Sequence, residues 1–158
     1  MQFEASPDER AVACYRDALL AATVAAPGAH DLLGGLARRG RRLAVVTNAY
    51  DAGAQHRRVE ATGLAEHLDA VVIAIEVGRF KPDPGLLQEA ALRLGTAAAH
   101  CVAVGDSVDL DVAPARAAGM TSVLVGPVDH PSADAWVPDL GVLYGALSRP
   151  AASSGRAD

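Results

Sequence analysis

Lys81 is the only lysine in the chain, and the other thirteen basic residues are arginines. It opens the segment Lys81-Pro82-Asp83-Pro84, in which two prolines restrict the backbone. A compact ammonium group on such a stiff loop is suited to neutralising an anion. The alternative is that Lys81 is an ordinary exposed residue and that Asp83 only caps a helix.

Three carboxylates fall within six residues in the segment Gly105-Asp106-Ser107-Val108-Asp109-Leu110-Asp111. Crowded carboxylates repel one another, and a hard divalent cation such as Mg²⁺ is the usual compensation. This turn is therefore a candidate metal site, unless Asp106 only caps the following helix. Asp111, about one helical turn further on, can reach Lys81, whereas Asp109 is expected to face water.

Thr47 and Asn48 follow a short apolar run and provide a third polar pair. Their hydroxyl and amide, beside the exposed N–H groups of the next turn, suit a phosphate oxygen. A Thr/Asn helix cap would explain the same pair.

Apolar patterning predicts the strands and helices that carry these residues. Short apolar runs predict buried strands at residues 43–46, 69–75, 100–105 and 121–125. Helical spacing and capping residues predict helices at 7–24, at 32–40, from Asp51 to Gly63, from Asp83 to Gly95, at 108–118 and at 139–147. Alternating strands and helices indicate an α/β fold with a parallel sheet covered on both faces. Ligands of such a sheet bind where the strands end.

Composition limits the class of protein and its partners. A chain of 158 residues with 51% hydrophobic residues is the size of one domain. A net charge of -5 argues against binding to nucleic acid or an anionic membrane. The basic run at residues 38–42 stands at a predicted helix end, where a solvated turn is a better interpretation than a nucleic-acid patch.

The two cysteines, Cys14 and Cys101, are far apart in apolar stretches, so we expect reduced structural thiols. The start of the sequence has no apolar signal region, and no apolar run approaches the about 20 residues of a membrane span. We therefore expect a cytoplasmic protein. Ser6 to Glu9 forms a predicted capping box for the first helix, and the tail from Ser148 is expected to be disordered.

Together and in this order, the three polar segments closely resemble motifs II, III and IV of the haloacid dehalogenase (HAD) superfamily. The resemblance covers roughly residues 27–147 and includes Ala117-Ala118-Gly119-Met120. The segments 60–64 and 76–78 resemble the phosphatase branch with a small helical cap. The resemblance implies a Rossmann-like three-layer sandwich around a parallel sheet.

The resemblance also implies a role for each matching residue. Thr47 and Asn48 would hold the phosphoryl oxygens through a hydroxyl and a backbone amide. Lys81 would offset charge on the nucleophile and the phosphate, with Asp111 as its partner. Asp106 would bind Mg²⁺, the implied cofactor. The implied catalytic residues are thus Lys81 and Asp111, and the implied partner is a small phosphorylated metabolite.

One motif of the family has no match in this sequence. Motif I is an apolar strand ending in Asp-x-Asp, whose first aspartate attacks phosphorus and whose second acts as general acid and base. Asp8 is no substitute, because no apolar strand precedes it. Without this strand the chain should bind phosphate but not form an aspartyl-phosphate, and its affinity for Mg²⁺ should fall.

In the family the missing strand lies mid-sheet, between the strands ending at Thr47 and Asp106. An empty slot would leave backbone groups unpaired at about 1 to 3 kcal/mol each if they are buried. We therefore expect that these two strands close on each other, or that an absent N-terminal segment belongs between them.

We predict one function for this chain and keep two alternatives. The chain is predicted to be an N-terminally truncated Mg²⁺-dependent phosphomonoester phosphatase, inactive alone, with a cap remnant at residues 1–25, a core at 26–148 and a tail at 149–158. A non-catalytic phosphate-binding or scaffold protein is the alternative from another class. A metal-independent haloacid dehalogenase ranks third, because the acidic turn favours metal and phosphate.

Overall fold

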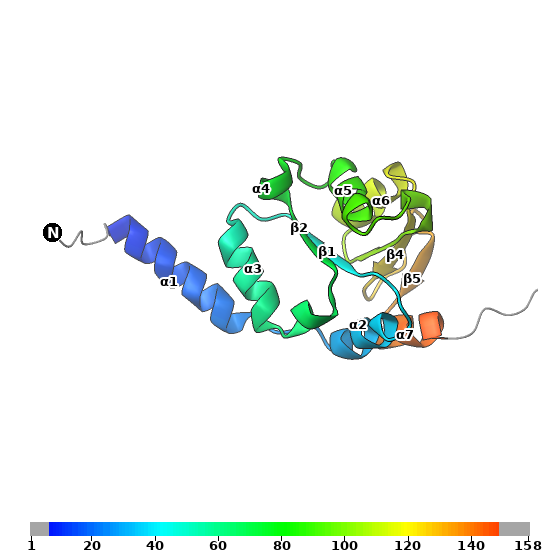
Figure 1. Cartoon of the computed structure of the whole chain (residues 1–158), viewed down its shortest axis with the longest axis horizontal. Coiled ribbons are helices and arrows are strands. Elements are labelled where there is room, and N and C mark those ends of the chain that lie inside the picture. Colours follow the sequence, from blue (N-terminus) through cyan, green and yellow to red (C-terminus); the bar gives the residue numbers. More distant parts are fainter. Residues whose placement is uncertain (1–6, 149–158) are drawn as a thin grey trace, which may run out of the picture.

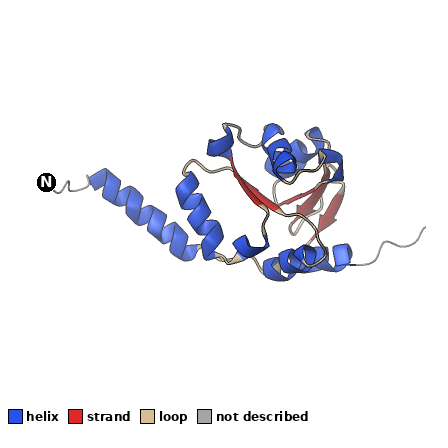
Figure 2. Cartoon of the chain, viewed as in Figure 1, coloured by secondary structure: helices blue, strands red, loops and turns tan. Residues whose placement is uncertain are grey.

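The computed structural model describes residues 7–148 and has an α/β architecture (Figures 1 and 2). The helices are α1 (Pro7–Ala22), α2 (Ala29–Ala37), α3 (Ala52–Ala61), η1 (Leu64–His67), α4 (Ala74–Val77), α5 (Gly85–Arg93), η2 (Ala98–His100), η3 (Val108–Val112), α6 (Ala113–Ala117) and α7 (Leu140–Ser148). The strands are β1 (Ala44–Thr47), β2 (Ala70–Ile73), β3 (Val102–Gly105), β4 (Thr121–Val125) and β5 (Ala135–Val137).

All strand pairs are parallel, as predicted, but the strands form two sheets. β1 pairs with β2 in the register Ala44 to Ala70, and β3, β4 and β5 follow one another in the second sheet. Both sheets share a helical layer, because Val46 of β1 and Ala103 of β3 pack against the same buried cluster from α5, α6 and the residues after α6. The Rossmann-like α/β class is therefore confirmed.

The opposite face of the second sheet is covered by α2 and α7, which lie together in Figure 1. Leu32 of α2 and Leu143 of α7 pack there against Val123 and Val137 of the sheet. The helix α1 lies apart from this body and extends outward beside α3 (Figure 1), and most of its residues are exposed. The layers thus surround β4 and leave α1 at one end.

The two sheets leave the facing edges of β1 and β3 unpaired. Within residues 7–148 no backbone ladder joins these strands, so the predicted closure of one on the other does not occur. Val102 and Val104 on β3 are 51% and 42% exposed. The edge is therefore in contact with solvent, and water can satisfy the N–H and C=O groups whose burial would have been costly.

Several predicted boundaries differ from the structure. The strand predicted at residues 69–75 ends at Ile73, and Ala74 begins the short helix α4. The helix predicted at 108–118 opens with the π-helical turn η3. The strand β5 was not predicted. Ser148, where the predicted disordered tail begins, is instead the last residue of α7. The predicted capping box at Ser6 and the rest of the predicted tail lie outside the described residues.

Gly35 in α2 allows α2 and α7 to approach closely, because a Cβ atom there would overlap the ring of Tyr144. We expect Gly35→Ala to lower the free energy of unfolding by about 1 to 3 kcal/mol through overpacking. Gly145→Ala in α7 is the control, because a Cβ atom there meets nothing within 4 Å. It should be neutral or stabilising by up to about 1 kcal/mol. Urea denaturation measures both, and equal effects would contradict this packing argument.

Asp134 connects β4 to the segment before β5. Its carboxylate accepts hydrogen bonds from the backbone N–H and hydroxyl of buried Ser122, at 2.9 and 2.7 Å, and pairs with Arg116 at 2.9 Å. The bonds from Ser122, with Arg116 nearby, hold the pKa of Asp134 below its ordinary value of 3.8.

Because the pKa of Asp134 is lowered in the folded protein, the free energy of unfolding should depend on pH in the acid range. The stabilisation by Asp134 is fully present above the ordinary pKa of 3.8 and is lost as pH falls through the lower folded value. Urea denaturation from pH 7 to pH 3 should therefore show a difference between wild type and Asp134→Asn that shrinks below about pH 4. Asp129→Asn, at an exposed carboxylate in the same loop, should show no such trend.

Candidate active site

Asn48 fixes the loop that carries Lys81. At the end of β1, its side-chain oxygen accepts a hydrogen bond from the Lys81 backbone N–H at 2.8 Å, and its amide nitrogen donates to the Lys81 carbonyl at 2.9 Å. Asn48 does not cap α3, because Asp51 occupies that position and accepts from the Ala54 N–H at 2.9 Å. The helix-cap interpretation of Thr47 and Asn48 is therefore wrong.

Lys81 points from this loop toward the end of β3. Its ammonium group pairs with Asp111 at 2.6 Å, and the two side chains are only 14% and 17% exposed. The predicted pairing of Lys81 with Asp111 is present, and the interpretation of Lys81 as an ordinary exposed residue is wrong. Asp83, in contrast, accepts from the Gly85 N–H at 2.7 Å and pairs with Arg79, but the N-cap residue of α5 is Pro84.

Asp111 also organises the acidic turn after β3. Its second carboxylate oxygen accepts from the backbone N–H groups of Asp106 at 3.2 Å and Ser107 at 3.1 Å. Gly105 is necessary for this approach, because a Cβ atom there would overlap the Asp111 side chain. Asn48, Lys81, Asp111 and the turn therefore form one continuous chain of contacts.

The carboxylate of Asp106 is left free by this arrangement. Ser107, not Asp106, is the N-cap residue of η3, where its hydroxyl accepts from the Leu110 N–H at 3.1 Å. The side chains of Asp106 and Asp109 are on exposed residues and make no hydrogen bond among the described residues. The Thr47 hydroxyl likewise has no partner in residues 7–148. Thr47 and Asp106 therefore remain available for a ligand.

Aromatic residues beside the site were missed from the sequence. The ring of Tyr50, which is 83% exposed, stacks on Phe80 with centroids 4.9 Å apart. Phe80 immediately precedes Lys81, so the stack adjoins the Lys81 loop. No periodicity pointed to this contact, because the two residues lie on loops 30 positions apart.

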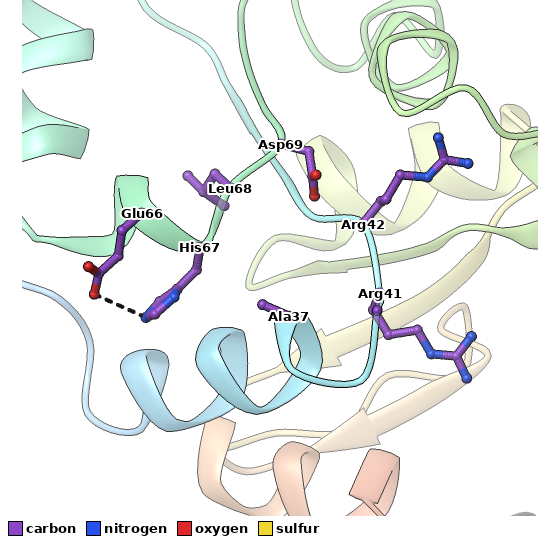
Figure 3. Close-up of a pocket in the computed structure, with 8 residues that line it drawn as sticks. Ala37, Arg41, Arg42, Glu66, His67, Leu68 and Asp69 are labelled. Atoms are coloured by element: carbon purple, nitrogen blue, oxygen red, sulfur yellow. Dashed lines mark ion pairs between the residues drawn. The ribbon is translucent and has the colours of Figure 1, made fainter.

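A separate hollow of about 270 Å³ lies at the opposite end of β1 and β2. Figure 3 shows Glu66 and His67, which pair at 3.5 Å, on one side of it, and Arg41 and Arg42, whose side chains extend away from that pair, on the other. Arg42 donates to the Gly95 carbonyl at the end of α5. None of the predicted site residues lines this hollow.

Comparisons with known sequences identify the family of this chain. A family model described as haloacid dehalogenase-like hydrolase matches residues 3–119. Phosphoserine phosphatase of Thermus thermophilus is 38% identical over 116 residues, which are 73% of this chain and 46% of that protein. Phosphoglycolate phosphatase of Rhodospirillum rubrum is 40% identical over 116 residues, covering 73% and 47%. The chain spans about half the length of these curated relatives.

Solved structures show the same relationship. A HAD phosphatase from Thermococcus onnurineus superposes with a TM-score of 0.71 at 30% identity, covering 77% of this chain and 57% of that one. A 2-haloacid dehalogenase from Pseudomonas syringae gives 0.65 at 30% identity, covering 77% and 52%. Because the family model matches well over half of the sequence, this chain belongs to the haloacid dehalogenase-like hydrolase family.

Proposed function

We propose that this chain is the phosphate-binding part of a Mg²⁺-dependent phosphatase that hydrolyses a small phosphomonoester through an aspartyl-phosphate. The main support for the proposal is the fixed position of Lys81. The Asn48 side chain bonds to its backbone, and Asp111 accepts a hydrogen bond from its ammonium group. A fixed cation with a free hydroxyl and a free carboxylate nearby suits phosphoryl transfer. The names of the relatives described above support the same reaction class.

Each residue has a defined part in this proposal. The Thr47 hydroxyl and the Asn48 backbone N–H donate to phosphoryl oxygens, while the Asn48 side chain remains on the Lys81 loop. The Lys81 ammonium group stabilises negative charge that develops on these oxygens. Asp111 is a positioning residue, because both of its carboxylate oxygens are already bonded within the chain.

Asp106 fits one position in the proposed Mg²⁺ site, because its exposed carboxylate is an oxygen ligand of the type that Mg²⁺ prefers. The described residues contain no group of three or more His, Cys, Asp or Glu side chains that could hold a metal ion. Further ligands would therefore have to come from another part of the protein or from water. A bound Mg²⁺ ion would supply charge neutralisation for the phosphate.

The nucleophile is proposed to come from an extended segment between β1 and β3. The unpaired edges of these strands border the site at their carboxyl ends, next to Thr47 and Asp106. A segment of a longer protein placed there would pair with both edges and bring a carboxylate toward the phosphate. In this proposal residues 1–25 are the end of a helical cap and residues 26–148 are the core.

A phosphatase assay with and without Mg²⁺ tests the proposal. The chain should be compared with a version extended upstream to include an apolar strand ending in Asp-x-Asp. We expect Mg²⁺-dependent hydrolysis of p-nitrophenyl phosphate only by the extended version, and phosphate-dependent thermal stabilisation of both. An extended version that neither binds phosphate nor hydrolyses the ester would refute the proposal.

Two other functions would give different results. The free Thr47 hydroxyl and the clamped Lys81 would also serve a protein that only binds phosphate, and stabilisation without turnover by the extended version would support that function. Mg²⁺-independent release of chloride from a halocarboxylate would support a dehalogenase. The acidic turn at Asp106 favours the phosphatase over the dehalogenase.

None of the helices in the described part of the chain is long and apolar enough to cross a membrane. We propose a cytoplasmic enzyme that acts on a small phosphorylated metabolite without nucleic acid or membrane as a partner. The net charge of -5 supports the absence of nucleic-acid binding.

A further inference from the structure

A hollow of about 310 Å³ lies between α1, α3 and the turn after β1. Asn48 is part of its lining, so the hollow adjoins the proposed phosphate site. Tyr50 also lines it, and the Tyr50 ring stacks on Phe80, the residue before Lys81. One wall of the hollow is therefore continuous with the loop that carries Lys81.

The charged side chains that line this hollow have a net positive charge. Three arginines and two aspartates line it, which leaves one positive charge in a chain whose net charge is -5. Asp51 is bonded to the Ala54 N–H and pairs with Arg16 at 3.0 Å. The Ala54 N–H, followed by Arg16, holds the pKa of Asp51 below its ordinary value, so this carboxylate stays ionised near neutral pH.

The remaining two arginines differ in their partners. Arg58 donates to the Thr23 hydroxyl at 3.0 Å and to the side-chain oxygen of Gln55 at 3.3 Å, both neutral groups. Arg57 is exposed and makes no hydrogen bond or ion pair among residues 7–148. The charge of Arg57 helps to lower the pKa of Asp51, but its guanidinium group has no hydrogen-bond or ion-pair partner in residues 7–148 and can therefore bind an anion.

We propose that this hollow holds the organic part of the substrate and that Arg57 binds a carboxylate on it. The proposal rests on the phosphatase function, because the phosphate site at Thr47 and Lys81 provides the other anchor. A guanidinium group and a carboxylate can form two parallel hydrogen bonds. The single excess positive charge matches one carboxylate better than a second, doubly charged phosphate. The preferred substrates are then small phosphorylated hydroxy acids.

Two ligands that differ in one group test this proposal on the chain itself. Ethyl phosphate and phosphoglycolate both carry a phosphomonoester, but only phosphoglycolate carries a carboxylate. Titration calorimetry at low ionic strength with Mg²⁺ should show that phosphoglycolate binds about tenfold more tightly. The preference should decrease as salt is added, because Arg57 is exposed.

Matched arginine variants identify the residue responsible. Arg57→Gln should abolish the preference for phosphoglycolate and leave the affinity for ethyl phosphate unchanged. Arg41→Gln removes the same charge from the opposite end of β1, where Arg41 is also exposed and without a hydrogen bond among residues 7–148, so it should retain the preference (Figure 3). Circular dichroism of both variants verifies that they are folded.

The outcomes separate this inference from the proposed function. Equal affinity of wild type for the two ligands, or a preference that Arg57→Gln retains, would overturn the assignment of Arg57 while leaving the phosphate site intact. A preference lost equally in Arg41→Gln would show only a general charge effect and would also overturn it. Failure to bind either ligand would refute the phosphate site itself, and this inference with it.

Discussion

Replacing Lys81 with methionine should lower the turnover number of the upstream-extended protein by about 10²- to 10³-fold. Lys81 is the only lysine in the chain, and its ammonium group is fixed by Asp111 at 2.6 Å. A fixed cation stabilises the charge that develops on a transferring phosphoryl group without the cost of reorganisation. Methionine keeps much of the side-chain volume but removes this charge. Steady-state hydrolysis of p-nitrophenyl phosphate measures the loss.

Arg79→Met is the matched control for Lys81→Met. Arg79 lies two positions earlier, is 57% exposed and pairs with Asp83 at 3.2 Å within the same loop. Its loss removes one positive charge near the site but leaves the bonds of Lys81 to Asn48 and Asp111 in place. We expect turnover within about threefold of wild type, since exposed ion pairs contribute little. Comparable losses in the two variants would contradict a specific role for Lys81.

Asp111→Ala should lower the free energy of unfolding of the chain by about 2 to 4 kcal/mol. The substitution leaves Lys81, which is 14% exposed, without its counter-charge. It also leaves the backbone N–H groups of Asp106 and Ser107 without their acceptor. Urea denaturation measures the loss, and reduced affinity for phosphate should accompany it because the turn is no longer fixed.

The neighbouring aspartate provides the control for Asp111. Asp109 lies on the same turn, on an exposed residue, and makes no hydrogen bond in the described part of the chain. Asp109→Ala should change the stability by less than about 0.5 kcal/mol. Asp111→Asn keeps an acceptor oxygen for the turn but loses the charge, so its effect should be intermediate. Asp111→Ala with the stability of Asp109→Ala would refute the structural role of this carboxylate.

Much of the fold could be predicted because parallel strands with both faces covered leave continuous apolar runs. The strand at Thr121–Val125 was predicted to the residue. The strand β5 was missed because Ala135–Val137 has three residues, too few to show a period. Its position depends on tertiary contacts, including the bond of Trp136 Nε1 to the Gly126 carbonyl at 2.8 Å, which no local pattern indicates.

The site could be predicted at the level of segments but not of atoms. From their order along the chain, Thr47, Lys81 and Asp106 were expected at one edge of a single sheet, but Thr47 ends a strand of the first sheet and Asp106 follows a strand of the second. The pairing of Lys81 with Asp111, expected from helical spacing, is present. The use of both ends of the Asn48 amide on the Lys81 backbone was not predictable. These bonds depend on the contact between the loop after β1 and the loop that carries Lys81. The spacing of the two residues along the sequence does not specify that contact.

The unpaired edge of β3 should make the backbone amides along that edge exchange rapidly with solvent. The Thr121 N–H of β4 donates to the Cys101 carbonyl, so the backbone groups of Cys101 face β4. Alternate residues of a parallel strand face the same neighbour, so the backbone groups of Ala103 and Gly105 also face β4. The N–H groups of Val102 and Val104 then face the unpaired edge, toward β1. Deuterium should therefore enter quickly at Val102 and Val104 and slowly at Ala103. A strand that occupies the gap would slow exchange at both valines, so these two amides report whether the sheet is complete.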